Sequence, residues 1–191
     1  MAFFTQADAR AAAKRAHGHR SIKAVITESL ESYKAATSFD IFLSHSSSDA
    51  ELIIGIKALL EENGKRVYVD WVDDPELDRS RVTKDTAARL RHRMVQSESL
   101  FYVATDNATK SKWMPWELGF FDGLKRNRVR ILPVLASSNQ SFDGQEYLGL
   151  YPVVSKDELE VGSSAKDLKQ AMRMLQESGR FPLSGIGRPR F

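Results

Sequence analysis

Short apolar runs alternate with longer amphipathic segments through most of this 191-residue chain, and this alternation restricts the possible folds more than any other feature. Runs that suit buried strands lie at residues 39–44, 66–71, 99–105 and 129–136, with a shorter one at 148–154. Segments with helical periodicity lie at residues 49–64, 82–96, 111–127 and 165–178. Strands joined through helices form βαβ units, so the pattern predicts an α/β fold with a mostly parallel sheet covered on both faces.

The two ends of the chain do not share this pattern. Residues 1–37 are rich in Ala, Lys, Arg and Glu, with Gly18 as an interruption, which predicts an N-terminal helical extension of two helices. Residues 180–191 (RFPLSGIGRPRF) are expected to form a loose C-terminal tail. One domain is therefore predicted between them, at residues 38–179.

The amino-acid composition excludes several classes of function. Hydrophobic residues make up 42% of the chain and charged residues 28%, as in ordinary globular proteins. The sequence contains no cysteine, so disulfides and thiolate chemistry are excluded and a reducing, cytoplasmic setting is expected. Apolar runs are too short to cross a membrane. The excess of basic residues lies in residues 1–37 and 180–191, without the basic stripe of a nucleic-acid surface, so neither membrane nor nucleic acid is an expected partner.

Three polar segments follow predicted strands: SHSSSD after the first, DWVDDPELDR after the second and TDNATKSKWMPWE after the third. In open parallel sheets the ligand crevice lies beyond the carboxyl ends of the strands. We therefore expect the functional residues in these segments.

Glu117 is the most informative residue among them. In a helix over residues 111–127, Trp113, Glu117, Phe120 and Phe121 share one face, which places a carboxylate within an apolar stripe. An acid near a helix start is often only a favourable partner of the helix dipole. An acid that faces an apolar crevice needs a hydrogen-bonding partner instead, and sugar hydroxyls provide such donors. Glu117 is the candidate catalytic residue.

Further candidates surround the same crevice. The predicted substrate-binding residues are Ser44, His45, Ser46, Asp70, Trp71, Lys110, Trp113 and Trp116. Several have a structural alternative: His45 as the cap of a turn, Trp71, Trp113 and Trp116 as core residues, and Lys110 as a solvated loop residue. The histidines show no metal-ligand spacing, so no metal site is expected.

Three motifs resemble the signatures of the TIR domain: FDIFLSHSSSD (39–49), VYVDWVDDPELDRSRV (67–82) and SKWMPWELGFFDG (111–123). The resemblance implies a flavodoxin-like three-layer fold with five strands in the order 2-1-3-4-5. It aligns Glu117 with the glutamate of the enzymatic branch, which cleaves NAD⁺ at the nicotinamide–ribose bond. NAD⁺ is then the substrate and no cofactor is required. The expected products are ADP-ribose or a cyclic ADP-ribose isomer, made in immune signalling such as anti-phage defence and sensed by a downstream effector.

The segment after the second predicted strand resembles the BB loop, through which TIR domains associate. The resemblance implies self-association through residues 72–81 into a dimer or filament. The loop carries charges of both signs: Asp73, Asp74, Glu76, Asp78, Arg79 and Arg81. It departs from the shorter glycine-containing loop of many members. Two alternatives to an NAD⁺-cleaving enzyme stay open, a non-catalytic TIR interaction module and a relative of the nucleoside deoxyribosyltransferases.

Overall fold

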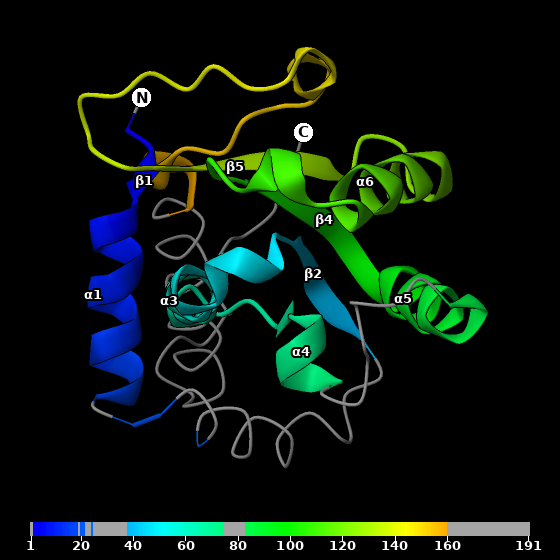
Figure 1. Cartoon of the computed structure of the whole chain (residues 1–191), viewed down its shortest axis with the longest axis horizontal. Helices are drawn as coiled ribbons and strands as arrows, with labels where there is room; N and C mark the ends of the chain where they lie inside the picture. Colours follow the sequence, from blue (N-terminus) through cyan, green and yellow to red (C-terminus); the bar gives the residue numbers. More distant parts are fainter. Residues whose placement is uncertain (1, 19, 22–23, 25–37, 75–82, 160–191) are drawn as a thin grey trace, which may run out of the picture.

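The computed structural model describes residues 2–18, 20–21, 24, 38–74 and 83–159. Its centre is a sheet of five parallel strands in the order β1-β5-β4-β2-β3 (Figure 1). The strands are β1 (Phe4–Thr5), β2 (Phe39–Ser44), β3 (Val67–Tyr68), β4 (Ser97–Ala104) and β5 (Val129–Leu135). The predicted α/β, flavodoxin-like class with a parallel sheet is confirmed.

The first four predicted strands take the predicted order 2-1-3-4, as β3-β2-β4-β5. The strand that pairs with the outer edge of β5 is not the predicted one. Phe4 and Thr5 pair there with Val134 and Leu135, whereas the predicted strand at 148–154 is reduced to one bridge between Val153 and Ile131. Pro152 offers no N–H to a ladder, and residues Glu146–Leu150 form the 3₁₀ helix η3 instead.

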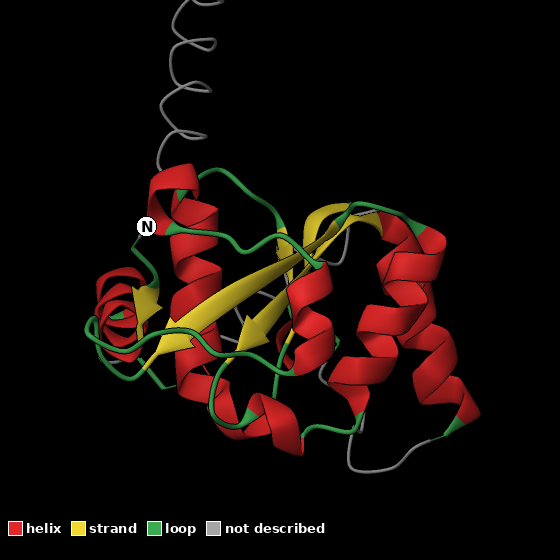
Figure 2. Ribbon diagram, turned by 90° about the horizontal axis from the view of Figure 1, so that it is seen from above, coloured by secondary structure: helices red, strands yellow, loops and turns green. Residues whose placement is uncertain are grey.

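Helices cover both faces of the sheet (Figure 2). Helices α1 (Gln6–His17) and α3 (Ala50–Glu62) lie on one face, and α5 (Lys84–Gln96) and α6 (Trp113–Leu124) lie on the other. Three short elements, η1 (Ser47–Asp49), α4 (Asp70–Asp73) and η2 (Ala108–Lys110), follow the ends of β2, β3 and β4. The predicted helices at 49–64, 82–96 and 111–127 are therefore confirmed with slightly shorter bounds.

The predicted strand at 66–71 is wrong in its second half, because Asp70–Asp73 is helical. The first predicted N-terminal helix is confirmed as α1, which begins at a capping box between Thr5 and Asp8 and ends before Gly18. The predicted second N-terminal helix, the helix at 165–178 and the tail at 180–191 lie outside the described residues, apart from isolated positions before residue 25.

Side chains alternate across β4, the middle strand. Leu100, Tyr102 and Ala104 belong to the core under α5 and α6, whereas Phe101 and Val103 belong to the core under α1 and α3. Both faces are buried, which explains the near-continuous apolar runs of the strands. Within the described part of the chain, no helix combines the length and apolar character needed to cross a membrane.

Candidate active site

Glu117 faces the sheet from the start of α6 and is completely buried. The helix begins at Trp113, and the N–H of Met114 donates to Ser111 Oγ at 3.3 Å. Pro115 is the third helical residue and Glu117 the fifth, so Glu117 lies just past the first turn, later than the sequence predicted. Its side chain does not point to solvent, which argues against a surface acid that only complements the helix dipole.

Ser44 holds the Glu117 side chain. It is the last residue of β2 and is completely buried. Its hydroxyl donates to Glu117 Oε2 across 2.6 Å, a length typical of a hydrogen bond to a carboxylate. The end of β2 and the start of α6 therefore meet in one buried polar contact, at the edge of the sheet where the sequence places the ligand crevice.

Tyr102 is the register partner of Ser44 on the neighbouring strand β4, and it was not predicted from the sequence. It is completely buried on β4, and burial raises its pKa, as do the nearby Tyr147 and Glu117. Its hydroxyl therefore stays protonated at neutral pH. Tyr147 is its hydrogen-bonding neighbour, and the Glu117 carboxylate lies near enough to act on it.

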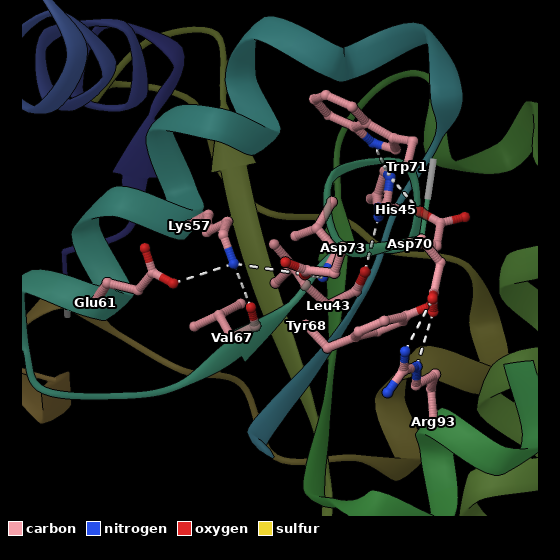
Figure 3. A network of polar contacts seen from close by, with 12 residues as sticks. Leu43, His45, Lys57, Glu61, Val67, Tyr68, Asp70, Trp71, Asp73 and Arg93 are labelled. Carbon is pink, nitrogen blue, oxygen red and sulfur yellow. Dashed lines mark hydrogen bonds and ion pairs between the residues drawn. The ribbon is translucent and has the colours of Figure 1, made fainter. Parts of the chain in front are cut away.

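His45 anchors α4 rather than facing an open crevice (Figure 3). Its Nδ1 lies 2.7 Å from the carbonyl oxygen of Leu43, and the indole N–H of Trp71 donates to its Nε2 at 2.8 Å. Asp70 Oδ1 lies 3.4 Å from the same Nε2. Since Nε2 accepts a hydrogen bond, the network assigns the ring proton to Nδ1. His45 and Asp70 are buried and Trp71 is partly exposed.

The other predicted binding residues have separate surroundings. Ser46 caps η1 by accepting from the N–H of Ser48. Lys110 is exposed and donates to Asn107, whose side chain in turn donates to the buried Asp49. Neither Ser46 nor Lys110 is brought to Glu117 by a contact seen here, and their substrate-binding roles stay predictions.

The two remaining tryptophans line a groove between the first turns of α5 and α6, with a volume of about 750 Å³. Trp113 is buried in the core, and Trp116 is partly exposed and stacks on Phe120 at 5.8 Å. The guanidinium of Arg91 lies 5.4 Å from the Trp116 ring centre. Trp116 therefore offers an aromatic surface, whereas Trp113 is fixed by packing.

At the start of the predicted BB loop, Asp73 and Asp74 make contacts within the fold, and self-association through residues 72–81 stays a prediction. Asp73 closes α4, accepts from the N–H of Val69 at 2.6 Å and lies 3.6 Å from the buried Lys57 ammonium (Figure 3). Asp74 receives two hydrogen bonds from Arg93, at 2.8 and 2.9 Å, and one from the hydroxyl of Tyr68. The loop charges at 76–81 lie outside the described residues.

Asp73 predicts a specific pH dependence of stability. Burial raises its pKa from 3.8 to about 6, against the opposing effect of Lys57. The folded protein thus keeps a proton that the unfolded chain loses, and the free energy of unfolding falls as the pH rises from about 4 to about 6. Asp73→Asn removes this titration. Between pH 4 and pH 7, the stability of the variant relative to wild type should improve by about 3 kcal/mol in urea unfolding.

Asp74→Asn is the matched control, because the pKa of Asp74 is shifted in the opposite direction from that of Asp73. Burial favours a higher pKa for Asp74, but the hydrogen bonds from Arg93 and Tyr68 outweigh it and lower the pKa. Its carboxylate stabilises the fold above the unfolded pKa, and this contribution is lost as the pH falls. The deficit of Asp74→Asn should therefore grow with rising pH. The same pH trend in both variants would contradict the assignment of Asp73.

The comparisons with known proteins agree with the motifs. A family model described as TIR domain matches residues 41–176. The chain is 45% identical over 169 residues to the probable 3' cyclic ADP-D-ribose synthase ThsB' of Bacillus cereus (strain MSX-D12), a match covering 84% of this chain and 87% of the relative. It is 34% identical over 83 residues to a Cytobacillus dafuensis protein provisionally named cyclic ADP-D-ribose synthase TIR2, covering 43% of this chain and 22% of that protein.

Among solved structures, the TIR domain of the Toll-related receptor TRR-2 from Hydra magnipapillata aligns with a TM-score of 0.46 and 16% identity, over 71% of this chain and 99% of that one. The family resemblance predicted from three motifs is confirmed by the family model and the Bacillus relative. Since the model spans more than half of the sequence and the relative aligns along most of it, the chain belongs to the TIR domain family.

Proposed function

We propose that this TIR domain cleaves the nicotinamide–ribose bond of NAD⁺ and closes the remaining ADP-ribose into a cyclic isomer. The observation that carries the proposal is the buried Glu117 carboxylate, held by Ser44 at the carboxyl edge of the sheet. The 45% identity to a protein named as a 3' cyclic ADP-D-ribose synthase supports the same reaction. That name makes the 3' isomer the first product to seek.

One carboxylate is sufficient for this bond cleavage. The nicotinamide ring nitrogen is already cationic in NAD⁺, so the ring leaves as a neutral molecule and needs no general acid, whereas ordinary glycosidases use two carboxyl groups. Positive charge develops on the ribose as the bond breaks. Glu117 would accept hydrogen bonds from the ribose hydroxyls and stabilise that charge, an effect that is stronger in a site with little water.

Burial of the contact between Ser44 and Glu117 also bears on the product. Water that reaches the ribose cation gives ADP-ribose, whereas the adenine of the same molecule gives a cyclic isomer. Glu117 is completely buried, and a site that closes again around bound NAD⁺ would exclude water and favour capture by adenine. The same burial means that NAD⁺ reaches Glu117 only when the surrounding chain moves.

The cellular role is part of the proposal. A cyclic nucleotide product suits a signal, so we place the chain in anti-phage immune signalling with a downstream effector that senses the product. Self-association into a dimer or filament and the cytoplasmic location stay predictions from the sequence, as do the domain limits and the need for no metal or cofactor.

The direct test is to incubate purified protein with NAD⁺ over a range of protein concentrations and to separate the products by liquid chromatography and mass spectrometry. We expect nicotinamide release together with a cyclic ADP-ribose isomer. ADP-ribose alone would reject cyclisation but keep cleavage. Unchanged NAD⁺ at every concentration would favour the non-catalytic interaction module.

Ser44→Ala tests whether the serine positions the catalytic carboxylate. The variant keeps Glu117 but removes the hydrogen bond that fixes it. Because a hydrogen bond to a charged group contributes about 1.5–3 kcal/mol, kcat should fall about 10- to 100-fold. The KM for NAD⁺ should change little, and both constants come from initial rates of nicotinamide release.

Ser99→Ala is the matched control for this variant. Ser99 is also a strand serine with one internal hydrogen bond, which it donates to the carbonyl of Asp40. It lies near the amino end of β4, whereas Ser44 lies at the carboxyl end of β2. An equal loss of kcat in the two variants would show a general effect on the sheet. An unchanged kcat in Ser44→Ala would remove Ser44 from the mechanism.

A further inference from the structure

We propose that a pocket between α1 and α3 binds a nucleoside diphosphate. We call it the α1–α3 pocket. The two helices pack against each other (Figure 1), and the pocket that they line has a volume of about 480 Å³. The lining residues that the proposal uses are Arg10, Ala13, Lys14, Arg20, Glu51 and Ile54.

The α1–α3 pocket is separate from the candidate active site. Helices α1 and α3 cover one face of the sheet, whereas Glu117 lies on α6, which covers the other. Helix α1 also precedes residues 41–176, the part of the chain that the TIR family model matches. The pocket therefore depends on residues that the N-terminal extension adds to the TIR domain.

One face of α1 forms a basic wall of the pocket. Arg10, Ala13, Lys14 and His17 all line it, because their offsets of three, four and seven residues place them on the same side of a helix. Arg10 has an acidic partner in Glu51 at 3.5 Å, whereas Lys14 has none among the described residues. The helix dipole accounts for basic residues in the last turn of a helix, but not for their position around a hollow. This wall offers positive charge to an anionic ligand.

Arg20 adds a third cation to the pocket. Its guanidinium donates to the carbonyl oxygens of Ala16 and His17, at 3.1 and 3.0 Å. These bonds hold the guanidinium beside the pocket and cover two carbonyl oxygens that would otherwise repel an anion. Glu51 is the only acid among the described residues that line the pocket. Guanidinium and ammonium groups are the usual partners of phosphate, so an excess of cations over acids here suits a diphosphate.

The pocket has room for more than a phosphate group. Sites for small organic ligands typically measure about 300–1,000 Å³ and combine apolar surface with a few polar groups, and the α1–α3 pocket lies within that range. Ala13 of α1 and Ile54 of α3 supply uncharged surface on which a flat base can pack. A nucleotide provides both parts, a charged diphosphate and an uncharged ring.

The test is binding of ADP to the full chain, measured by isothermal titration calorimetry in wild type, Lys14→Ala and Arg15→Ala. Each substitution removes one positive charge from α1 and introduces the best helix former, so both variants should keep the fold. Lys14→Ala should raise the dissociation constant for ADP about fivefold, the upper value for one exposed ion pair. Arg15 pairs with Glu62 and does not line the pocket, so Arg15→Ala should bind ADP as wild type does.

Pyrophosphate and adenosine test the class of ligand. Each is one half of the proposed ligand, so each should bind wild type more weakly than ADP does. Pyrophosphate binding as tightly as ADP would show that the apolar surface is not used and would overturn the nucleotide. Adenosine binding as tightly as ADP would show that the cations are not used and would overturn it as well.

Equal ADP affinity in wild type and Lys14→Ala would overturn the site, and this includes the case in which ADP binds only near Glu117. An equal loss of affinity in Lys14→Ala and Arg15→Ala would also overturn it, because it would show a general effect of net charge. The measurement does not require turnover. Binding of ADP that depends on Lys14 would stand even if the protein did not cleave NAD⁺, and NAD⁺ cleavage would stand even if the α1–α3 pocket bound no nucleotide.

Discussion

Glu117→Gln is expected to abolish measurable NAD⁺ cleavage while leaving the fold intact. Glutamine has the same shape, and its amide oxygen can still accept the hydrogen bond that Ser44 donates. What is lost is the negative charge that would stabilise the ribose cation. Removal of one preorganised electrostatic group typically lowers kcat by ~10²–10³, and we expect at least this reduction in nicotinamide release.

Stability separates this prediction from a purely structural role of Glu117. A buried charge is costly when it is incompletely compensated, so its neutral replacement should keep or raise the thermal midpoint. A core acid without catalytic function would show the same stability but unchanged turnover. Both quantities should therefore be measured on the same preparation, turnover by nicotinamide release and stability by thermal unfolding.

Glu98→Gln provides the matched control. Glu98 is exposed near the amino end of β4, at the opposite edge of the sheet from Glu117. The substitution makes the same chemical change, so turnover should match wild type. Retention of wild-type turnover by Glu117→Gln would place the reaction elsewhere, and loss of turnover in both variants would point to an effect of net charge.

The sequence predicts those elements whose side-chain periodicity reflects local burial. Helices α3, α5 and α6 and strands β2, β4 and β5 each follow the expected spacing, so their bounds came out within a few residues. The two-residue strand β1 has no such pattern. Phe4 and Thr5 pair with β5 because that strand has a free edge, which is a property of the assembled sheet.

Helix α4 shows a second reason for failure. DWVD continues an apolar run and reads as strand, but its conformation is held by contacts that are distant in sequence. The indole of Trp71 donates a hydrogen bond to His45, which directly follows β2, and Asp73 lies beside Lys57 of α3. Local propensity cannot include partners that only the fold brings near.

The sequence predicted where the candidate site lies in the fold, but it predicted only some of the contacts within the site. The helical offsets correctly placed Glu117 on the buried face of α6. The structure joins Ser44 to Glu117, and its expected contact with substrate stays a prediction. Tyr102 was missed, although its alternation with Leu100 and Ala104 puts it on the α6 side of the sheet. A hydroxyl on that face near the strand end was the available signal.

Gly55→Ala is expected to destabilise the fold, because α1 and α3 approach each other closely at Gly55. A Cβ atom at this position would lie 1.9 Å from the carbonyl oxygen of Ala9. That oxygen belongs to the backbone of α1, so it cannot move aside as a flexible side chain would. Alanine therefore requires the whole helix to shift away from α3.

The shift would also disturb the sheet. Strand β1 ends at Thr5, which caps α1 directly, so a displaced α1 pulls on the pairing of Phe4 and Thr5 with β5. Overpacking of a core typically costs about 1–3 kcal/mol and sometimes more. This outweighs the gain of about 0.5–1 kcal/mol that alanine brings over glycine within a helix. Because the clash is with backbone, we expect a net fall in the free energy of unfolding in urea of about 1–2 kcal/mol.

Gly123→Ala separates the steric effect from helix propensity. Gly123 is also a helical glycine, but a Cβ atom there would meet nothing within 4 Å. This variant should be more stable than wild type by about 0.5–1 kcal/mol, so the two alanine substitutions should differ in sign. If Gly55→Ala also stabilised the protein, α1 would not be packed against α3 in solution. The N-terminal segment would then be separable from the TIR domain, as the sequence alone suggested, and hydrogen exchange along α1 would be as fast as in an isolated helix.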